Sequence, residues 1–166
     1  MIKRIVWWIL TILCALMILD FSSQSAAQSS ELSNSLTQSV LEKFFAYQNL
    51  SPEAQAAVLE QTHILFREIA HIVTFAALGF CASMLARSYA LRRWVVVVFS
   101  SCVVFAVLDE CLQHVLNAGR AFQFIDLLKD WIGSLLGIAV IMLIGWVTHR
   151  RILGGQSDGV SGSGAG

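Results

Sequence analysis

Four long apolar stretches limit what this chain can fold into. They cover residues 5–21, 69–86, 94–115 and 125–147. Each has about the 17 to 25 residues that a helix needs to cross a hydrocarbon core of roughly 30 Å. The sequence therefore predicts an all-α membrane protein, built as a four-helix transmembrane bundle.

The composition agrees with a membrane domain. The 166 residues are 57% hydrophobic and only 13% charged, whereas an ordinary soluble domain has roughly 25% charged residues. The formal net charge is zero and the basic residues form short clusters at the ends of the apolar stretches. We therefore expect no nucleic-acid partner.

The basic residues also predict an orientation, because Lys and Arg concentrate in cytoplasmic loops. Seven of the eleven precede the first stretch, link the second to the third or follow the fourth, and three fall on the opposite side. We therefore expect both termini in the cytoplasm. The seven are Lys3, Arg4, Arg87, Arg92, Arg93, Arg150 and Arg151, and the three are Lys43, Arg67 and Arg120.

The first stretch has two interpretations. Lys3-Arg4, the apolar run and Ser25-Ala26-Ala27 are also typical of a cleavable signal peptide. The apolar run of about 15 residues is at the long limit for such a peptide, which favours an uncleaved span. Cleavage remains the alternative.

The loop between the first two spans is expected to be extracytoplasmic and helical. Five apolar residues recur there at helical spacing: Leu36, Val40, Leu41, Phe44 and Phe45. Ser51-Pro52-Glu53 is typical of a helix start, and we expect that helix to reach Phe66 and join the second span. Its apolar faces lie on the outer membrane surface or cover the bundle.

One membrane domain is expected over residues 1–153. The remaining residues 154–166 are rich in Gly and Ser. A segment of this composition is typical of a flexible linker. We therefore predict a disordered tail after the fourth span.

Ionisable side chains gather at one level of the predicted bundle. With four alternating spans, the start of the second, the end of the third and the start of the fourth meet near the outer surface. Charged groups in a bilayer are costly, so they usually pair, line a cavity or carry the function. We take eight residues as candidate ligand-binding groups: Arg67, His71, Asp109, Glu110, Gln113, Arg120, Asp126 and Asp130.

Helical spacing assigns these groups to faces. Asp109 shares a face with Gln113, and Arg67 shares one with His71. On the fourth span one face carries Asp126, Asp130, Gly133 and Gly137, and we expect it to point into the bundle. The two glycines would let a neighbouring helix approach closely. We expect Leu127, Leu135 and Ile138 to lean toward lipid.

The cluster holds an excess of acid. Its cations are Arg67, Arg120 and Lys129, and its carboxylates are Glu68, Asp109, Glu110, Asp126 and Asp130. One interpretation is a set of ion pairs that holds the helices in register, and the other is a binding or catalytic pocket. No HExxH-type spacing occurs, and we expect neither a metal nor another cofactor.

At these residues the chain resembles the VanZ-like family of small bacterial membrane proteins. The matching elements are Phe21-Ser22-Ser23-Gln24, Arg67 with Ala70-His71, Asp109-Glu110 with Gln113, Gly119-Arg120, Asp126, Asp130, Gly133 and Gly137. The chain departs from the family pattern at Glu68, where Lys is usual, and at Thr74 and Phe75, where Glu and Tyr often stand. The resemblance implies a multi-pass protein of the bacterial cytoplasmic (inner) membrane. It also links the chain to resistance against teicoplanin-type glycopeptide antibiotics.

Three functions remain open at this point. In the first, an outward-facing charged pocket binds or modifies a membrane lipid or an anionic, lipid-linked cell-envelope molecule, with Arg67 and Arg120 on its phosphate. In the second, the protein is a membrane enzyme in which Asp109 or Glu110 acts as general acid or base on a lipid phosphate. In the third, it is a membrane assembly module without chemistry.

Overall fold

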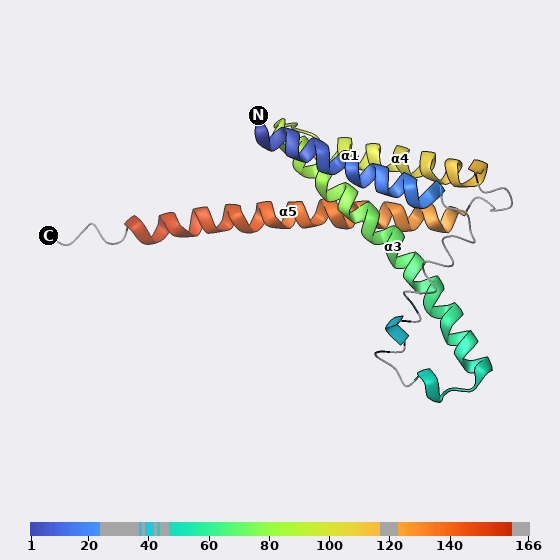
Figure 1. The fold of residues 1–166 in the computed structure, drawn as a ribbon. Helices are drawn as coiled ribbons and strands as arrows, with labels where there is room; N and C mark the ends of the chain where they lie inside the picture. Colours follow the sequence, from blue (N-terminus) through green and yellow to red (C-terminus); the bar gives the residue numbers. More distant parts are fainter. Residues whose placement is uncertain (24–36, 38, 42, 44–46, 117–122, 161–166) are drawn as a thin grey trace.

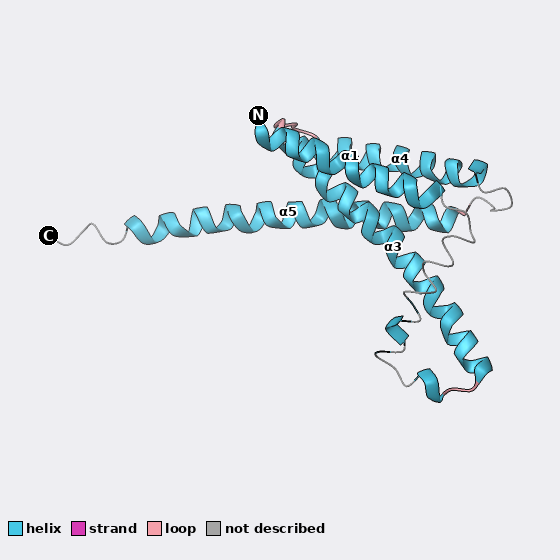
Figure 2. Cartoon of the chain, in the orientation of Figure 1, coloured by secondary structure: helices cyan, strands magenta, loops and turns pink. Residues whose placement is uncertain are grey.

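The structure is a computed structural model, and it describes residues 1–23, 37, 39–41, 43, 47–116 and 123–160. Its ordered elements are α1 (Ile2–Ser23), the short 3-10 helix η1 (Tyr47–Asn49), α3 (Pro52–Ser88), α4 (Trp94–Leu116) and α5 (Phe124–Val160). Figure 2 shows no strand in these described ranges. The prediction of an all-α protein is therefore confirmed.

In the described part of the chain, four helices are long and apolar enough to cross a membrane. They are α1 with 22 residues, α3 with 37, α4 with 23 and the Phe124–Arg150 part of α5 with 27. Large apolar side chains such as Leu13, Val104 and Leu143 stay exposed on their outer faces, as expected for a surface in contact with lipid. The chain is therefore a multi-pass membrane protein with four candidate spans.

The helices pack around α3 (Figure 1). α3 crosses the bundle obliquely and makes its most extensive contact with α5, while α1 lies against α3 and α4. The core takes residues from all four helices: Ile18, Phe75, Leu78, Ala86, Val98, Cys102, Ala106, Leu127 and Ile138. No helix of the bundle is therefore peripheral to the core.

The start of α3 follows the sequence prediction. Ser51 caps the helix, with its side-chain oxygen accepting a hydrogen bond from the backbone N–H of Ala54 at 3.3 Å. Pro52 fills the first turn, where its missing N–H costs nothing, and Glu53 lies at the positive end of the helix dipole. The helix runs without a break into the second span, as predicted.

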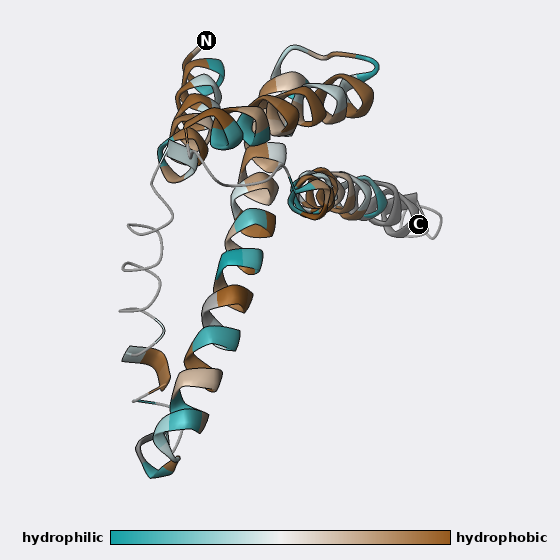
Figure 3. Ribbon diagram, turned by 90° about the vertical axis from the view of Figure 1, so that its right-hand side faces the viewer, coloured by the Kyte–Doolittle hydropathy of each residue, from teal (hydrophilic) through white to brown (hydrophobic). Residues whose placement is uncertain are grey.

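α3 is longer than a membrane is thick. At about 1.5 Å per residue its 37 residues extend about 55 Å, against a hydrocarbon core of roughly 30 Å. Its N-terminal part therefore projects away from the other helices (Figures 1 and 3). Figure 3 shows hydrophilic and hydrophobic residues alternating along this part. We call the described residues of 37–43 together with 47–66 the arm.

The predicted helix before η1 falls partly on the arm. Thr37, Val40, Leu41 and Lys43 are helical, and Leu41 is buried. Leu36, Phe44 and Phe45, which also belong to the predicted apolar face, lie outside the described residues. The described part agrees with the predicted helix.

Glycines let α3 and α5 meet at their backbones. A Cβ atom on Gly133 would collide with the main chain of Ile72, and one on Gly137 with the main chain of Ala76. From the other side, a Cβ on Gly79 would lie 2.6 Å from the carbonyl oxygen of Ser134. The prediction that these small residues permit close helix approach is confirmed.

The predicted orientation of α5 is right in part. Asp126, Asp130, Gly133 and Gly137 face the interior, and Leu135 is exposed. The prediction was wrong for Leu127 and Ile138, which are buried in the core. The reason is that α5 packs against α4 as well as α3, so its buried face is wider than a single contact stripe.

The end of α5 differs from the predicted disordered tail. The helix continues to Val160, so residues 154–160 are helical, and residues 161–166 lie outside the described part of the chain. Extending a helix needs only one more ordered residue for each hydrogen bond gained. The single proline of the chain is Pro52, so no proline stops α5 there.

The basic residues that flank the first three spans gather at one end of the bundle. The Nε of Arg4 donates to the Ser88 carbonyl oxygen at 3.1 Å, and its guanidinium lies 4.7 Å from the ring centre of Tyr89. The guanidinium of Arg87 lies 5.7 Å from the ring centre of Trp94. We call this the basic end. The carboxylates predicted to cluster lie toward the other end, where α4 finishes and α5 begins.

Candidate functional site

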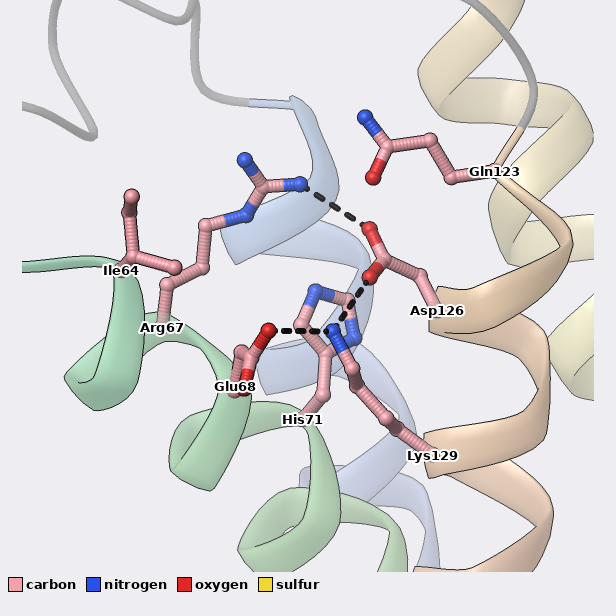
Figure 4. Close-up of a pocket in the computed structure, with 7 residues that line it drawn as sticks. All are labelled: Ile64, Arg67, Glu68, His71, Gln123, Asp126 and Lys129. Carbon is pink, nitrogen blue, oxygen red and sulfur yellow. Dashed lines mark hydrogen bonds and ion pairs between the residues drawn. The ribbon is translucent and has the colours of Figure 1, made fainter. Parts of the chain in front are cut away.

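A polar pocket opens between α3 and α5 (Figure 4). It has a volume of about 100 Å³, which is room for several water molecules or a small ionic group. Residues of α3 and α5, together with Gln123 just before α5, supply its lining, and one of the seven is apolar. The lining residues are Ile64, Arg67, Glu68, His71, Gln123, Asp126 and Lys129.

Ion pairs join the two walls of this pocket. The Nη2 of Arg67 donates to the Oδ2 of Asp126 at 3.0 Å. The Nζ of Lys129 donates to the Oδ1 of Asp126 and to the Oε1 of Glu68, each at 3.0 Å. Asp126 therefore holds two cations at once, as the dashed lines of Figure 4 show.

The members of this network differ in their access to solvent. The Asp126 side chain is only 5% exposed, while those of Arg67 and Lys129 are 32% and 17% exposed. A guanidinium carries five N–H donors and an ammonium three. Within the described chain, Arg67 uses one of these donors and Lys129 uses two. Toward the described residues, both cations therefore keep donors for a further acceptor.

His71 connects the pocket to a deeper carboxylate. Its Nδ1 lies 3.0 Å from the Oδ1 of Asp130, and the Asp130 side chain is 1% exposed. Asp130 follows Asp126 by about one helical turn, as His71 follows Arg67. Each acid therefore lies beside one of these two α3 residues. The predicted common face of Arg67 and His71 is confirmed.

A second polar cluster lies between α4 and α1. The Nε2 of Gln113 donates to the Oδ2 of Asp109 at 3.0 Å and to the hydroxyl oxygen of Ser22 at 3.1 Å. All three residues are buried. Asp109 and Gln113 share a face, as predicted, and their contacts tie the end of α1 to α4.

Glu110 of α4 binds the main chain just before α5. Its Oε1 accepts a hydrogen bond from the backbone N–H of Gln123 at 2.7 Å, next to the positive end of the α5 dipole. Its Oε2 and the Oδ1 of Asp109 are buried without a hydrogen-bond partner among the described residues. We also expect Asp109, Glu110 and Arg120 to contact one another or a shared ligand, because all three reach the same level of the membrane. Arg120 lies outside the described residues, so this stays a prediction.

The structure divides the predicted site residues into two groups. Arg67, His71 and Asp126 line the polar pocket, and Asp130 pairs with His71 behind it. Asp109, Glu110 and Gln113 are absent from the pocket lining and serve contacts among α1, α4 and the start of α5.

Three polar residues of the lining were missing from the candidate ligand-binding groups. Lys129 follows Asp126 by three positions within an apolar stretch, and this spacing was a usable signal for a pair on one helix. Glu68 is adjacent to Arg67. From the sequence, Glu68 and Lys129 were counted only in the charge balance of the cluster. Nothing in the sequence singled out Gln123. Within the described ranges, no group of three or more His, Cys, Asp or Glu side chains is arranged to hold a metal ion.

Comparison with known families identifies the family of the chain. The model of the VanZ/LLP1 family matches residues 7–145. The chain belongs to the VanZ/LLP1 family. The match to VanZ/LLP1 takes in the whole lining of the polar pocket and most of all four spans. No curated protein and no solved structure matches the chain.

Proposed function

We propose that this VanZ/LLP1-family protein binds an anionic group of a lipid-linked cell-envelope molecule in the polar pocket. One observation carries the proposal: Arg67 and Lys129 line the pocket together and retain N–H donors beyond their ion pairs. Charge-assisted hydrogen bonds from such donors to phosphate are strong. A phosphate is the anionic group that links many envelope molecules to their lipid.

Binding fits the geometry better than catalysis by Asp109 or Glu110. A general base must come within hydrogen-bond reach of the proton it removes. Neither of these carboxylates is among the described residues that line the pocket, and both are buried. The enzyme hypothesis therefore lacks its proposed base at the place where a substrate would sit.

The basic end supports an orientation for this site. Lys3, Arg4, Arg87, Arg92 and Arg93 belong to it, and an excess of Lys and Arg marks the cytoplasmic side of a membrane protein. The polar pocket lies toward the other end, between the first turns of α5 and the middle of α3. In the bacterial inner membrane it would then face the outer leaflet, with both termini in the cytoplasm.

A fusion after Arg151 tests this orientation. We expect a reporter that is active only in the cytoplasm to be active at this position and a reporter that is active only outside to be silent. A fusion in the 117–122 connection should give the opposite pattern. Activity of the outside reporter after Arg151 would overturn the orientation and favour cleavage of the first stretch.

Lipid binding tests the function. The purified protein should bind a polyprenyl phosphate or phosphatidic acid in preference to phosphatidylcholine, measured by native mass spectrometry. Arg67→Gln should weaken this binding roughly tenfold, because a charged hydrogen bond contributes about 1.5 to 3 kcal/mol. Lys129→Gln should act in the same direction.

Arg92→Gln is the matched control, since it removes a positive charge from an exposed residue at the basic end. We expect it to leave binding unchanged. Equal losses in the Arg67 and Arg92 variants would indicate a general charge effect and exclude the pocket. Preference for polyprenyl phosphate over phosphatidic acid would identify a lipid-linked envelope carrier as the ligand.

The same site offers a route to the resistance that the VanZ-like resemblance implies. A protein that engages a lipid-linked envelope molecule at the outer leaflet acts where glycopeptide antibiotics meet their target. We propose that any protection against a teicoplanin-type antibiotic depends on Arg67 and Lys129. If the Arg67→Gln and Lys129→Gln variants both still protect against the antibiotic, resistance does not depend on the polar pocket.

A further inference from the structure

The arm contains a second pocket, and it is apolar. This groove has a volume of about 580 Å³, within the range of about 300 to 1,000 Å³ that is usual for ligand pockets. The segment before α3 forms one wall and the projecting part of α3 forms the other. The lining residues are Val40, Leu41, Tyr47, Leu50, Val58, Thr62, Leu65 and Phe66.

The two polar residues in the lining direct their hydroxyl groups to the main chain. The Thr62 hydroxyl donates to the Val58 carbonyl oxygen at 2.7 Å, and the Tyr47 hydroxyl donates to the Gln55 carbonyl oxygen at 3.1 Å. Neither donor is therefore free for a ligand. The groove offers a methyl group, two aromatic rings and aliphatic side chains, which together form a surface for hydrocarbon.

Hydrogen bonds hold the two walls of the groove together. The side-chain amide of Gln55 on α3 donates to the carbonyl oxygens of Tyr47 at 3.2 Å and Leu50 at 3.1 Å. Together with the Tyr47 hydroxyl bond, this joins the segment before α3 to the first turns of the helix. These hydrogen bonds therefore fix the two walls of the groove relative to each other.

The α3 wall of the groove continues into the lipid-facing surface of the second span. Val58, Thr62 and Leu65 are followed at helical spacing by Ile69 and Val73, which lie on the same face. Ile69 and Val73 are 44% and 57% exposed, and in a spanning helix such side chains face lipid. The groove therefore opens along one continuous apolar stripe toward the hydrocarbon of the membrane.

We propose that this groove binds one hydrocarbon chain of a membrane lipid, which enters from the bilayer along Ile69 and Val73. The site is separate from the polar pocket, because Arg67 and His71 lie on a different face of α3 from Leu65 and Ile69. The proposal therefore does not rest on the proposed function. A neutral lipid would satisfy it, since none of the described residues that line the groove is charged.

Photolabelling of the full chain tests this site. The protein is reconstituted in phosphatidylcholine vesicles that contain a phosphatidylcholine with a diazirine in its acyl chain. After illumination, labelled peptides are located by mass spectrometry. We expect residues 47–66 to be labelled more strongly than the exposed face of α5 around Leu143, because a bound chain stays in contact longer than bulk lipid.

Two variants change the groove in different ways. Val58→Trp fills it with an apolar ring, and Leu65→Glu places a carboxylate at an exposed part of its wall. Each should reduce labelling of residues 47–66 to the level of the α5 face, while Leu143→Trp, a change at an exposed site, should leave it unchanged. Arg67→Gln should also leave it unchanged, which separates this site from the anion pocket.

Several results would overturn the proposal. One is labelling of residues 47–66 that does not exceed that of the α5 face. Another is labelling that persists in both groove variants although circular dichroism shows them folded. A third is crosslinking between two copies through residues 47–66 with loss of lipid label, which would assign the groove to a second copy of the chain.

Discussion

Gly137→Ala should destabilise the protein strongly, although it adds only one methyl group. The new Cβ would collide with the carbonyl oxygen of Ala76 and lie 2.7 Å from the backbone nitrogen of Phe80. Backbone atoms of a helix cannot rotate away, so α3 and α5 must separate along their crossing. Overpacking of this kind costs about 1 to 3 kcal/mol or more. Thermal unfolding of the purified protein in detergent would show a large fall in the melting temperature.

Gly145→Ala is the matched control on the same helix. The three atoms nearest to a Cβ at this position all belong to the guanidinium of Arg87, with the Nη1 at 3.1 Å, and this group is the far end of a flexible side chain. Alanine also favours helix over glycine by up to about 1 kcal/mol. We therefore expect a melting temperature equal to that of the wild type or slightly higher. If both alanine variants melt alike, α3 and α5 do not cross at Gly137.

The number of candidate spans could be predicted because it depends on length and polarity alone. The start of α3 was also predictable, since Ser51, Pro52 and Glu53 each favour the first turn for a separate local reason. The width of the buried face of α5 was not predictable. Periodicity identifies the centre of a buried face, but Leu127 and Ile138 flank that centre and are buried because α4 supplies a second contact.

For the candidate site, the sequence predicted only the depth in the membrane at which its residues meet. Alternating spans bring the acids of α4 and α5 to the same end, so Asp109 and Asp126 looked equivalent in the sequence. Which acid faces which cation depends on how each helix is rotated and how obliquely α3 crosses. That geometry sends Asp126 to Arg67 and Lys129, and Asp109 to Gln113 and Ser22 on the other side.

Asp126→Asn should weaken the fold because it leaves two cations without their shared carboxylate. Asp126 is buried, while Arg67 is about one-third exposed, so water recovers part of the loss at the arginine. Removing one partner of a buried ion pair costs about 3 to 5 kcal/mol, and we expect a value near the lower limit. Unfolding in a denaturant series would measure it.

Glu68→Gln is the matched control, since Glu68 also pairs with Lys129 at 3.0 Å but is 44% exposed. An exposed pair contributes about 0 to 1 kcal/mol, so this change should have almost no effect on stability.

Asp126→Asn should also release donors of Arg67 and Lys129, and the folded fraction should then bind an anionic lipid more tightly. Lower stability with tighter binding would show that Asp126 competes with the ligand for the same two cations. Lower stability with weaker binding would show instead that Asp126 positions the two cations. It would contradict the idea that Asp126 and the ligand compete for the same donors.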